Sequence, residues 1–302
     1  MKLHSLSRRE FVRQTAALAG AALFSSPALL AAEAMRTKRT AVDQVPLGKT
    51  GLKLSRLGIG TGTNSGQVQK AMGREAFERL VRYAYDQGIT YIDAAQSYAT
   101  FEWIGGAIKG LPREKLFIQS KILGQSEKVL ETIDRHRKVF DTDYVDSLLI
   151  HCMIKDGWTD GAKRLMDALD EAQQKQWIRA KGVSCHSLPA LRTATASPWT
   201  QVHLVRVNPQ AKYIDGMEQT WNKSGTDLEP VLAEVRTMRA KGRGVIGMKI
   251  IGNGDFTDAQ DREKSIRFAM SRGLLDAVVI GVKSTGEIDE AIERINRALA
   301  EA

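Results

Sequence analysis

Cysteine is scarce in this chain, with only Cys152 and Cys185 among 302 residues. Both lie at the ends of apolar runs that we expect to be buried strands, where a cysteine usually packs as a small hydrophobic side chain. Two cysteines without further residues at ligand spacing do not make a zinc site. We therefore expect no disulfide and no metal site.

A long uninterrupted hydrophobic run is also absent. The most apolar stretch, residues 14–32, contains two serines and a proline and is too weakly hydrophobic for a membrane anchor. Arg8 and Arg9 precede it, and small residues at the spacing of a cleavage site follow at 32–34. This order predicts a twin-arginine signal peptide over residues 1–34. It further predicts a periplasmic or secreted protein that uses the twin-arginine export machinery and has no stable membrane span.

Acidic residues are outnumbered, 35 against 44 basic ones, which gives a net charge of +9 and a pI near 9.5. A basic balance of this kind suits a nucleic-acid partner. The basic residues are spread along the chain, however, and the densest group, Arg36, Lys38 and Arg39, falls in residues 35–44, which we interpret as a linker. We therefore expect no nucleic-acid function. Hydrophobic residues, at 43%, are sufficient for a full core.

Short apolar runs alternate with helix-period segments along residues 45–302, after a hairpin-like segment at 46–54. Each run is continuously apolar, as expected for strands buried on both faces. The eight runs are 57–62 (with a glycine-rich loop), 90–93, 116–120, 145–150, 180–184, 204–208, 245–250 and 277–281. Eight such units in about 250 residues predict an α/β fold, a (β/α)8 TIM barrel with a short N-terminal β-hairpin.

A doubly wound open sheet is the competing fold. Its support is the spacing Gly58-x-Gly60-x-Gly62 after the first strand. That spacing departs from the G-x-G-x-x-G of dinucleotide-binding sheets, and no acid ends a strand about 20 residues later. No change of composition marks a second domain, so we interpret residues 45–302 as one barrel.

Four residues able to do chemistry lie at the ends of successive predicted strands. Asp93, Lys121 and His151 end the second, third and fourth runs, and Tyr98 lies five residues after Asp93. Reacting groups of such barrels sit at the C-terminal ends of the strands. Each residue alone could be a cap or a packing residue, but four at one end of adjacent strands indicate a site.

These residue types suit the reduction of a carbonyl group. A tyrosine with a pKa near ~10 is a poor acid at neutral pH. We expect the ammonium of Lys121 to lower the pKa of Tyr98, and Asp93 to keep Lys121 charged and fixed. His151 can donate a hydrogen bond to a carbonyl oxygen. The set can therefore polarise a carbonyl and give it a proton.

The four residues resemble the catalytic tetrad of the aldo-keto reductase family. The Asp-x4-Tyr spacing, the strands that lead to Lys121 and His151, and the glycine-rich loop at 57–62 all resemble that family's motifs, over about residues 45–300. The resemblance implies a (β/α)8 barrel that transfers a hydride from NADPH, or NADH, to an aldehyde or ketone. It implies that Tyr98 is the general acid and that Lys121, together with Asp93, lowers the pKa of Tyr98. It also implies that His151 orients the carbonyl of the substrate.

The resemblance also implies cofactor contacts, with NADP as cofactor and NAD as the alternative. The implied contacts are Gly60, Thr61, Ser184, Met248, Lys249, Lys283, Ser284 and Glu290. Among them, Ser184 matches the residue that holds the nicotinamide amide, and Glu290 matches the adenine contact. The chain departs from the family pattern at Cys185, Leu204 and Ala291, and the arginine expected for the 2′-phosphate is missing.

Two other functions fit parts of the pattern. One is a lyase barrel that forms a Schiff base through Lys121 or Lys249, although this chemistry does not require Asp93 and Tyr98 at their spacing. The other is a non-catalytic barrel that binds a nucleotide or another ligand. The departures at the cofactor positions favour this second alternative, and so does the predicted export, because no pool of NADPH is evident outside the cytoplasm.

Overall fold

The computed structural model describes residues 38–123, 128–221, 224–271 and 273–301. The compact unit that holds the site spans Thr40–Ala302. The predicted signal peptide, residues 1–34, lies outside the described residues. No helix among the described residues has the length and apolar character needed to cross a membrane.

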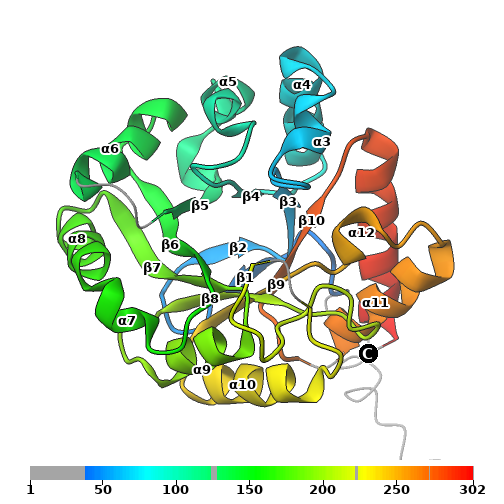
Figure 1. The fold of residues 1–302 in the computed structure, drawn as a ribbon. Coiled ribbons are helices and arrows are strands. Elements are labelled where there is room, and N and C mark those ends of the chain that lie inside the picture. Colours follow the sequence, from blue (N-terminus) through cyan, green and yellow to red (C-terminus); the bar gives the residue numbers. More distant parts are fainter. Residues whose placement is uncertain (1–37, 124–127, 222–223, 272, 302) are drawn as a thin grey trace, which may run out of the picture. The chain divides into compact units, whose positions relative to one another are not determined.

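Eight parallel strands form a closed barrel in the order β10-β3-β4-β5-β6-β7-β8-β9 (Figure 1). Their bounds are β3 (Leu57–Gly60), β4 (Tyr91–Asp93), β5 (Phe117–Ile122), β6 (Val145–Met153), β7 (Ile178–Cys185), β8 (Val202–Arg206), β9 (Gly244–Met248) and β10 (Ala277–Gly281). The pairing of β10 with β3 closes the sheet, with Ile280 opposite Ile59. The predicted (β/α)8 barrel is confirmed, and the open doubly wound sheet is excluded.

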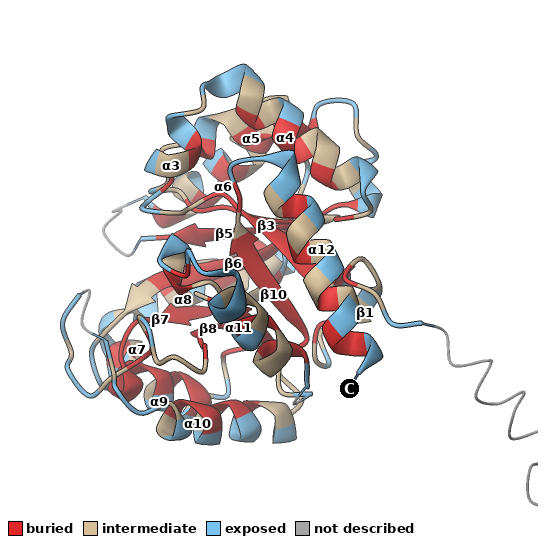
Figure 2. Cartoon of the chain, turned by 90° about the vertical axis from the view of Figure 1, so that its right-hand side faces the viewer, coloured by how far each residue is buried: buried red, intermediate tan, exposed pale blue. Residues whose placement is uncertain are grey.

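Helices surround the barrel on its outer side (Figure 1). They are α3 (Gln67–Lys70), α4 (Arg74–Asp86), η1 (Phe101–Trp103), α5 (Ile104–Ile108), η2 (Arg113–Lys115), α6 (Val129–Phe140), α7 (Trp158–Gly161), α8 (Lys163–Gln174), α9 (Leu188–Ala196), α10 (Glu229–Ala240), η3 (Gly252–Gly254), α11 (Ala259–Ser271) and α12 (Thr285–Ala300). Each long helix buries one apolar face against the strands, as Ile288, Ile295 and Leu299 do on α12. Figure 2 shows this pattern, with buried strands and exposed outer helix faces.

The predicted N-terminal hairpin closes one end of the barrel. Strands β1 (Gln44–Pro46) and β2 (Lys53–Ser55) pair antiparallel. Leu54 of β2 and Leu47, which directly follows β1, are fully buried and pack with the residues that fill the barrel interior. The N–H of Gly48 donates to the carboxylate of Asp276, just before β10, at 3.1 Å. Because the N-terminal end is plugged, the opposite end is the one open to ligands.

The barrel interior is a packed core that leads up to the site. The ring of Tyr91 lies edge-on to Phe117, with centroids 5.3 Å apart. A Cβ on Gly58 would lie 2.1 Å from the Tyr91 ring, so only glycine leaves room for it. The Tyr91 hydroxyl accepts a hydrogen bond of 2.8 Å from Nε2 of Gln119, one layer nearer the open end.

Two strands run further than their apolar runs predict. Strand β5 continues past Lys121 to Ile122, and β6 continues past His151 to Met153. The extension of β6 depends on an irregularity in its pairing with β7, where Cys152 has a φ of 60° and its N–H donates to the hydroxyl of Ser184 at 3.0 Å. Lys121 and His151 therefore lie within strands rather than after them.

Candidate active site

Asp93, the last residue of β4, faces the side chain of Lys121 on the neighbouring strand β5. Nζ of Lys121 lies 2.8 Å from each carboxylate oxygen of Asp93 and 2.8 Å from the carbonyl oxygen of Ala94. Nε2 of Gln119 also donates to Asp93 at 2.9 Å. The Lys121 side chain is only 1% exposed. A buried ion pair with these additional hydrogen bonds is held in one geometry.

The hydroxyl of Tyr98 completes this cluster. Nζ of Lys121 donates to it at 3.2 Å. Tyr98 lies in a turn after β4, in which its own N–H donates to the carbonyl of Ala95 at 3.0 Å. The backbone of Gly62, in the glycine-rich loop after β3, lies against the ring, and a Cβ there would be 2.2 Å from two ring carbons. The loop therefore positions the tyrosine.

Burial governs the protonation of this pair. It raises the pKa of Tyr98 to about 12, although the ammonium of Lys121 acts to lower it. Burial acts to lower the pKa of Lys121, but Asp93 and then Tyr98 outweigh it and raise that pKa. The expectation that Lys121 would bring the pKa of Tyr98 below its ordinary value is wrong. Desolvation destabilises the phenolate more than the charge of Lys121 stabilises it. At neutral pH Tyr98 is a phenol with a proton to give.

His151 lies beside Tyr98 on β6. The two rings are edge-on, with centroids 5.7 Å apart. Burial lowers the pKa of His151 to about 3, with smaller effects of Lys121 and Lys249 in the same direction. Its Nδ1 lies 3.3 Å from the hydroxyl of Ser97. The imidazole is therefore neutral, and if Ser97 donates to Nδ1, the ring proton is on Nε2.

A cavity of about 540 Å³ opens over these residues at the C-terminal end of the barrel. We call it the tetrad cavity. Tyr98, Lys121 and His151 form part of its lining. A small molecule in this cavity would meet a neutral proton donor, a charged lysine and a neutral imidazole on one wall. This arrangement can bind and protonate a carbonyl oxygen.

A groove connects the tetrad cavity to the start of α12. A cavity of about 480 Å³, the α12 cavity, is lined by residues from β10, α11 and α12. A cavity of about 70 Å³ joins the two, because it shares Asn253 and Gly254 with the α12 cavity and Tyr98 and Lys249 with the tetrad cavity. The amides in the first turn of a helix suit a phosphate. The three cavities thus form a series of shared lining residues from Tyr98 to the start of α12.

Comparison with known proteins identifies the family. Residues 56–301 match the family model described as the aldo/keto reductase family. The chain belongs to the aldo/keto reductase family. It is 27% identical over 175 residues to an NAD/NADP-dependent indole-3-acetaldehyde reductase of Schizosaccharomyces pombe, covering 53% of this chain and 58% of the relative. It is 36% identical over 117 residues to a glyoxal reductase of Bacillus subtilis, covering 37% and 41%. The chain thus spans about half the length of the curated relatives it matches.

Solved structures of aldo-keto reductases have the same fold. One from Pseudomonas aeruginosa superposes with a TM-score of 0.68 at 21% identity, covering 86% of this chain and 97% of that one. The holo form of one from Bacillus halodurans has a TM-score of 0.66 at 15% identity, covering 87% and 96%. At these identities the likeness establishes the barrel with its N-terminal hairpin.

Six of the eight residues with an implied cofactor role line the groove of this aldo/keto reductase family member. They are Gly60, Met248 and Lys249 in the joining cavity, Ser184 in the tetrad cavity, and Lys283 and Glu290 in the α12 cavity. The other two have structural bonds. Thr61 is buried, and its hydroxyl donates to the carbonyl of Asp93 at 2.9 Å. Ser284 accepts the N–H of Glu287 at 3.2 Å and caps α12.

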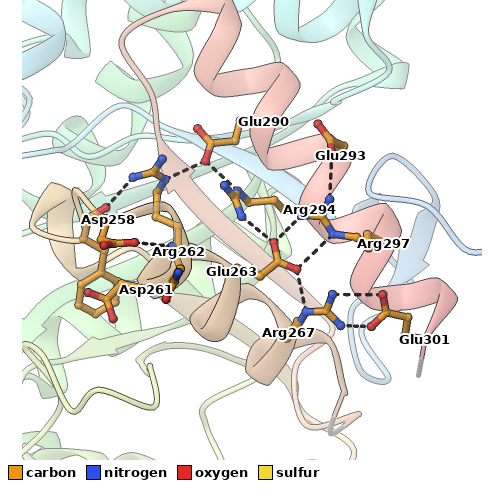
Figure 3. A network of polar contacts seen from close by, with 12 residues as sticks. Asp258, Asp261, Arg262, Glu263, Arg267, Glu290, Glu293, Arg294, Arg297 and Glu301 are labelled. Carbon is orange, nitrogen blue, oxygen red and sulfur yellow. Dashed lines mark hydrogen bonds and ion pairs between the residues drawn. The ribbon is translucent and has the colours of Figure 1, made fainter.

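Two arginines line the α12 cavity, although the loop motif lacks the arginine expected for the 2′-phosphate. Arg262, from α11, donates through Nε to Glu290 at 2.8 Å, and Arg294, from α12, donates to the same oxygen at 2.7 Å. Arg294 also contacts Glu263 at 2.6 Å (Figure 3). The loop motif gave no sign of Arg262 because this side chain reaches the cavity from a different helix.

Three further residues of the tetrad cavity lie outside the motifs. His186 follows β7 and stacks on Trp221, with ring centroids 4.9 Å apart and planes 7° apart. Arg206, at the end of β8, donates through Nη2 to the carbonyl of His186 at 2.7 Å. A polar residue at the end of a barrel strand is the one sequence signal that could have identified Arg206.

The two cysteines are free, as expected. Burial raises the pKa of Cys152 to about 12 and that of Cys185 well above its ordinary value. Both are therefore thiols, which makes them unreactive. Among the described residues, no group of three or more His, Cys, Asp or Glu side chains is arranged to hold a metal ion.

Proposed function

We propose that this protein is an NAD(P)H-dependent reductase that converts an aldehyde or ketone to the alcohol. The observation that carries the proposal is the contact of Tyr98 with Lys121. A neutral phenol lies 3.2 Å from an ammonium that is itself fixed by both oxygens of Asp93, at the wall of a cavity that continues into a nucleotide-sized groove. Fold and family membership alone would not select a reaction.

The chain's own residues bind and protonate the carbonyl in this reaction. When bound, the reduced nicotinamide supplies the hydride. Tyr98 donates its hydroxyl proton to the carbonyl oxygen as negative charge develops there. The charge on Lys121 stabilises the tyrosinate that remains, and a proton from solvent restores the phenol. His151 donates from Nε2 to the same oxygen and thereby orients the carbonyl.

The groove supports NADP as the cofactor, with NAD as the alternative. Lys283 lines its far end, at the start of α12, where a helix suits a phosphate. The carboxylate of Glu287 accepts the N–H of Lys283 at 2.8 Å, so a phosphate bound there would compete with it. Arg262 and Arg294 both lie on the wall of the α12 cavity, where a planar guanidinium could pair with a 2′-phosphate. Glu290 now joins the two arginines, so a 2′-phosphate would compete with this carboxylate.

The names of the relatives agree with this reading. The relative from Schizosaccharomyces pombe is a reductase of indole-3-acetaldehyde with either NAD or NADP, and the relative from Bacillus subtilis reduces glyoxal. Both substrates are carbonyl compounds of different size. We therefore propose a small-molecule carbonyl as the substrate.

Titration of the barrel, residues 40–302, with NADPH and NADH followed by a carbonyl screen tests the proposal. Binding of either nucleotide together with turnover of any aldehyde or ketone is expected. Tyr98→Phe should abolish turnover and leave nucleotide binding in place. Binding without turnover would favour the non-catalytic barrel, and turnover that survives Tyr98→Phe would remove Tyr98 from the mechanism.

A Schiff-base lyase is the second candidate, and one observation favours it. Burial, together with Arg206, lowers the pKa of Lys249 to about 8, and Lys249 lines the tetrad cavity. Amines of lowered pKa form Schiff bases readily. The test is to add borohydride and a carbonyl compound without nucleotide. Covalent trapping of the carbonyl compound on Lys249 or Lys121 would favour the lyase over the reductase.

We also propose that the protein is exported, on the strength of Arg8, Arg9 and the apolar stretch after them. Replacing both arginines by lysine should leave the precursor in the cytoplasm. Cell fractionation of the two forms measures this. Equal export of both would contradict a twin-arginine signal.

A further inference from the structure

A buried amide links the barrel core to the ion pair of the site. Gln119 lies on β5, two residues before Lys121, and is fully buried. Its Nε2 donates one hydrogen bond to the hydroxyl of Tyr91 at 2.8 Å and another to Oδ1 of Asp93 at 2.9 Å. A primary amide nitrogen carries two hydrogens, so both of them are used. The amide is therefore held by Tyr91 while it donates to Asp93.

The oxygen of the same amide is unpaired. Oε1 of Gln119 is buried and has no hydrogen-bond partner among the described residues. Turning the amide over would bring this oxygen against the carboxylate of Asp93, and two acceptors repel one another. A buried acceptor without a partner costs free energy, whereas an apolar side chain of similar size would avoid this cost. An amide that is kept at such a cost calls for a role beyond filling the core.

The contacts of Lys121 show what depends on the orientation of Asp93. Nζ lies 2.8 Å from both oxygens of Asp93 and from the carbonyl oxygen of Ala94, but 3.2 Å from the hydroxyl of Tyr98. An ammonium has three hydrogens, so these four oxygens compete for them, and Tyr98 is the most distant of the four. If the carboxylate turned, Nζ would follow it and the contact with Tyr98 would be the first to be lost.

We infer that Gln119 is a positioning residue, whose amide holds the carboxylate of Asp93 in the orientation that keeps Nζ of Lys121 within hydrogen-bond distance of Tyr98. This inference rests on the proposed reductase function. Gln119 lines neither the tetrad cavity, nor the joining cavity, nor the α12 cavity, so it acts through Asp93 and touches neither substrate nor nucleotide. Gln119 and Lys121 are two residues apart on one strand, so both side chains reach Asp93 from the same rigid element.

The variant Gln119→Met separates hydrogen bonding from packing, because methionine has a similar volume and no donor. The rate of carbonyl reduction in a single turnover, with nucleotide bound, should fall about tenfold or more, while the Kd of the nucleotide changes less than about twofold. Ser147→Ala is the matched control. Ser147 pairs with Gln119 across β5 and β6, and its buried hydroxyl has no partner among the described residues. The control should keep the native rate.

The variant Gln119→Glu adds a readout that packing alone would not move. A carboxyl group buried beside Asp93 should keep its proton above the ordinary glutamate pKa of about 4.3. In that form its O–H can donate to Asp93 in place of the amide, so the rate near about pH 5 should be close to native. It should then fall toward about pH 9 as the carboxyl ionises. A profile as flat as the native one, or a native rate in Gln119→Met, would overturn the inference.

An NMR measurement separates this inference from a failure of the reductase proposal, because it needs no turnover. The ammonium signal of Lys121, in protein with nitrogen-15 lysine, is assigned by its loss in Lys121→Met. Its hydrogen exchange with water should be about tenfold faster in Gln119→Met and native in Ser147→Ala. Faster exchange in a protein that reduces no carbonyl would keep the positioning role and contradict the reductase. Unchanged exchange in Gln119→Met would contradict the positioning role whether or not turnover is seen.

Discussion

The central contact of the site is the hydrogen bond from Lys121 to Tyr98. Burial determines the protonation state of Tyr98. The phenolate is destabilised by desolvation more than it is stabilised by the ammonium, so the pKa of Tyr98 is about 12. The imidazole of His151, with a pKa of about 3, is neutral. Both groups are thus in the form that donates to a carbonyl oxygen.

The pH dependence of the reduction follows from these two values. Protonation of His151 would require a pH near its pKa of about 3, and ionisation of Tyr98 a pH near its pKa of about 12. The kcat for reduction should therefore stay flat between about pH 5 and pH 9. If kcat changes with pH within this range, and the change disappears in His151→Asn, then the imidazole titrates there. That result would contradict a neutral His151.

Ser97 should set the tautomer of His151, because its hydroxyl lies 3.3 Å from Nδ1. In Ser97→Ala this partner is lost, and we expect kcat to fall about tenfold with little change in nucleotide binding. Nitrogen NMR of the imidazole should show a larger share of the Nδ1–H form. Ser97→Thr keeps the hydroxyl and should restore both the native kcat and the native tautomer ratio of the imidazole. An unchanged tautomer ratio in the alanine variant would assign Ser97 to packing.

At the scale of elements, the loops of neighbouring strands position the tetrad through close backbone contacts. Gly62→Ala would place a methyl group 2.2 Å from ring carbons of Tyr98, so the ring must move away from Lys121. A displacement of this kind should reduce kcat by about 100-fold. Gly161→Ala is the matched control, since nothing lies within 4 Å of a Cβ there. Near-native kcat in Gly62→Ala, with a folded protein, would contradict the positioning role.

The hairpin acts as a plug rather than as part of the site. Leu54 is fully buried and packs with the barrel interior. Leu54→Ala should therefore lower the free energy of unfolding by about 2–5 kcal/mol, measured by urea titration, while kcat stays close to native. Met217, at 62% exposure, is the control, and Met217→Ala should change stability by less than about 0.5 kcal/mol. A similar small effect of Leu54→Ala would mean that the hairpin does not seal the barrel.

The elements and the tetrad could be predicted because each has a local signal. A strand buried on both faces is a continuous apolar run, and Asp93, Lys121 and His151 lie at or near the ends of three such runs. The extension of β6 could not be predicted, since it depends on the positive φ of Cys152 and its bond to Ser184. These features arise only when β6 and β7 are paired.

At the scale of the whole molecule, the groove joins segments that are far apart in the chain. The four tetrad residues come from the first half of the sequence, and the α12 cavity is lined mostly by residues 251–294. Arg206, Arg262 and Arg294 reach it from three different elements, so no motif contains them. The shift in the pKa of Tyr98 was predicted in the wrong direction, because the burial that raises it is a property of the folded barrel and not of a local motif.

The most direct test of the proposed reductase is the transfer of a labelled hydride. The barrel, residues 40–302, would be mixed with NADPH deuterated at the transferable position and with an aromatic aldehyde, and the product examined by mass spectrometry. The proposal predicts one deuterium on the alcohol carbon, and none with Tyr98→Phe. Unlabelled or absent alcohol with both NADPH and NADH, across a screen of aldehydes and ketones, would contradict it.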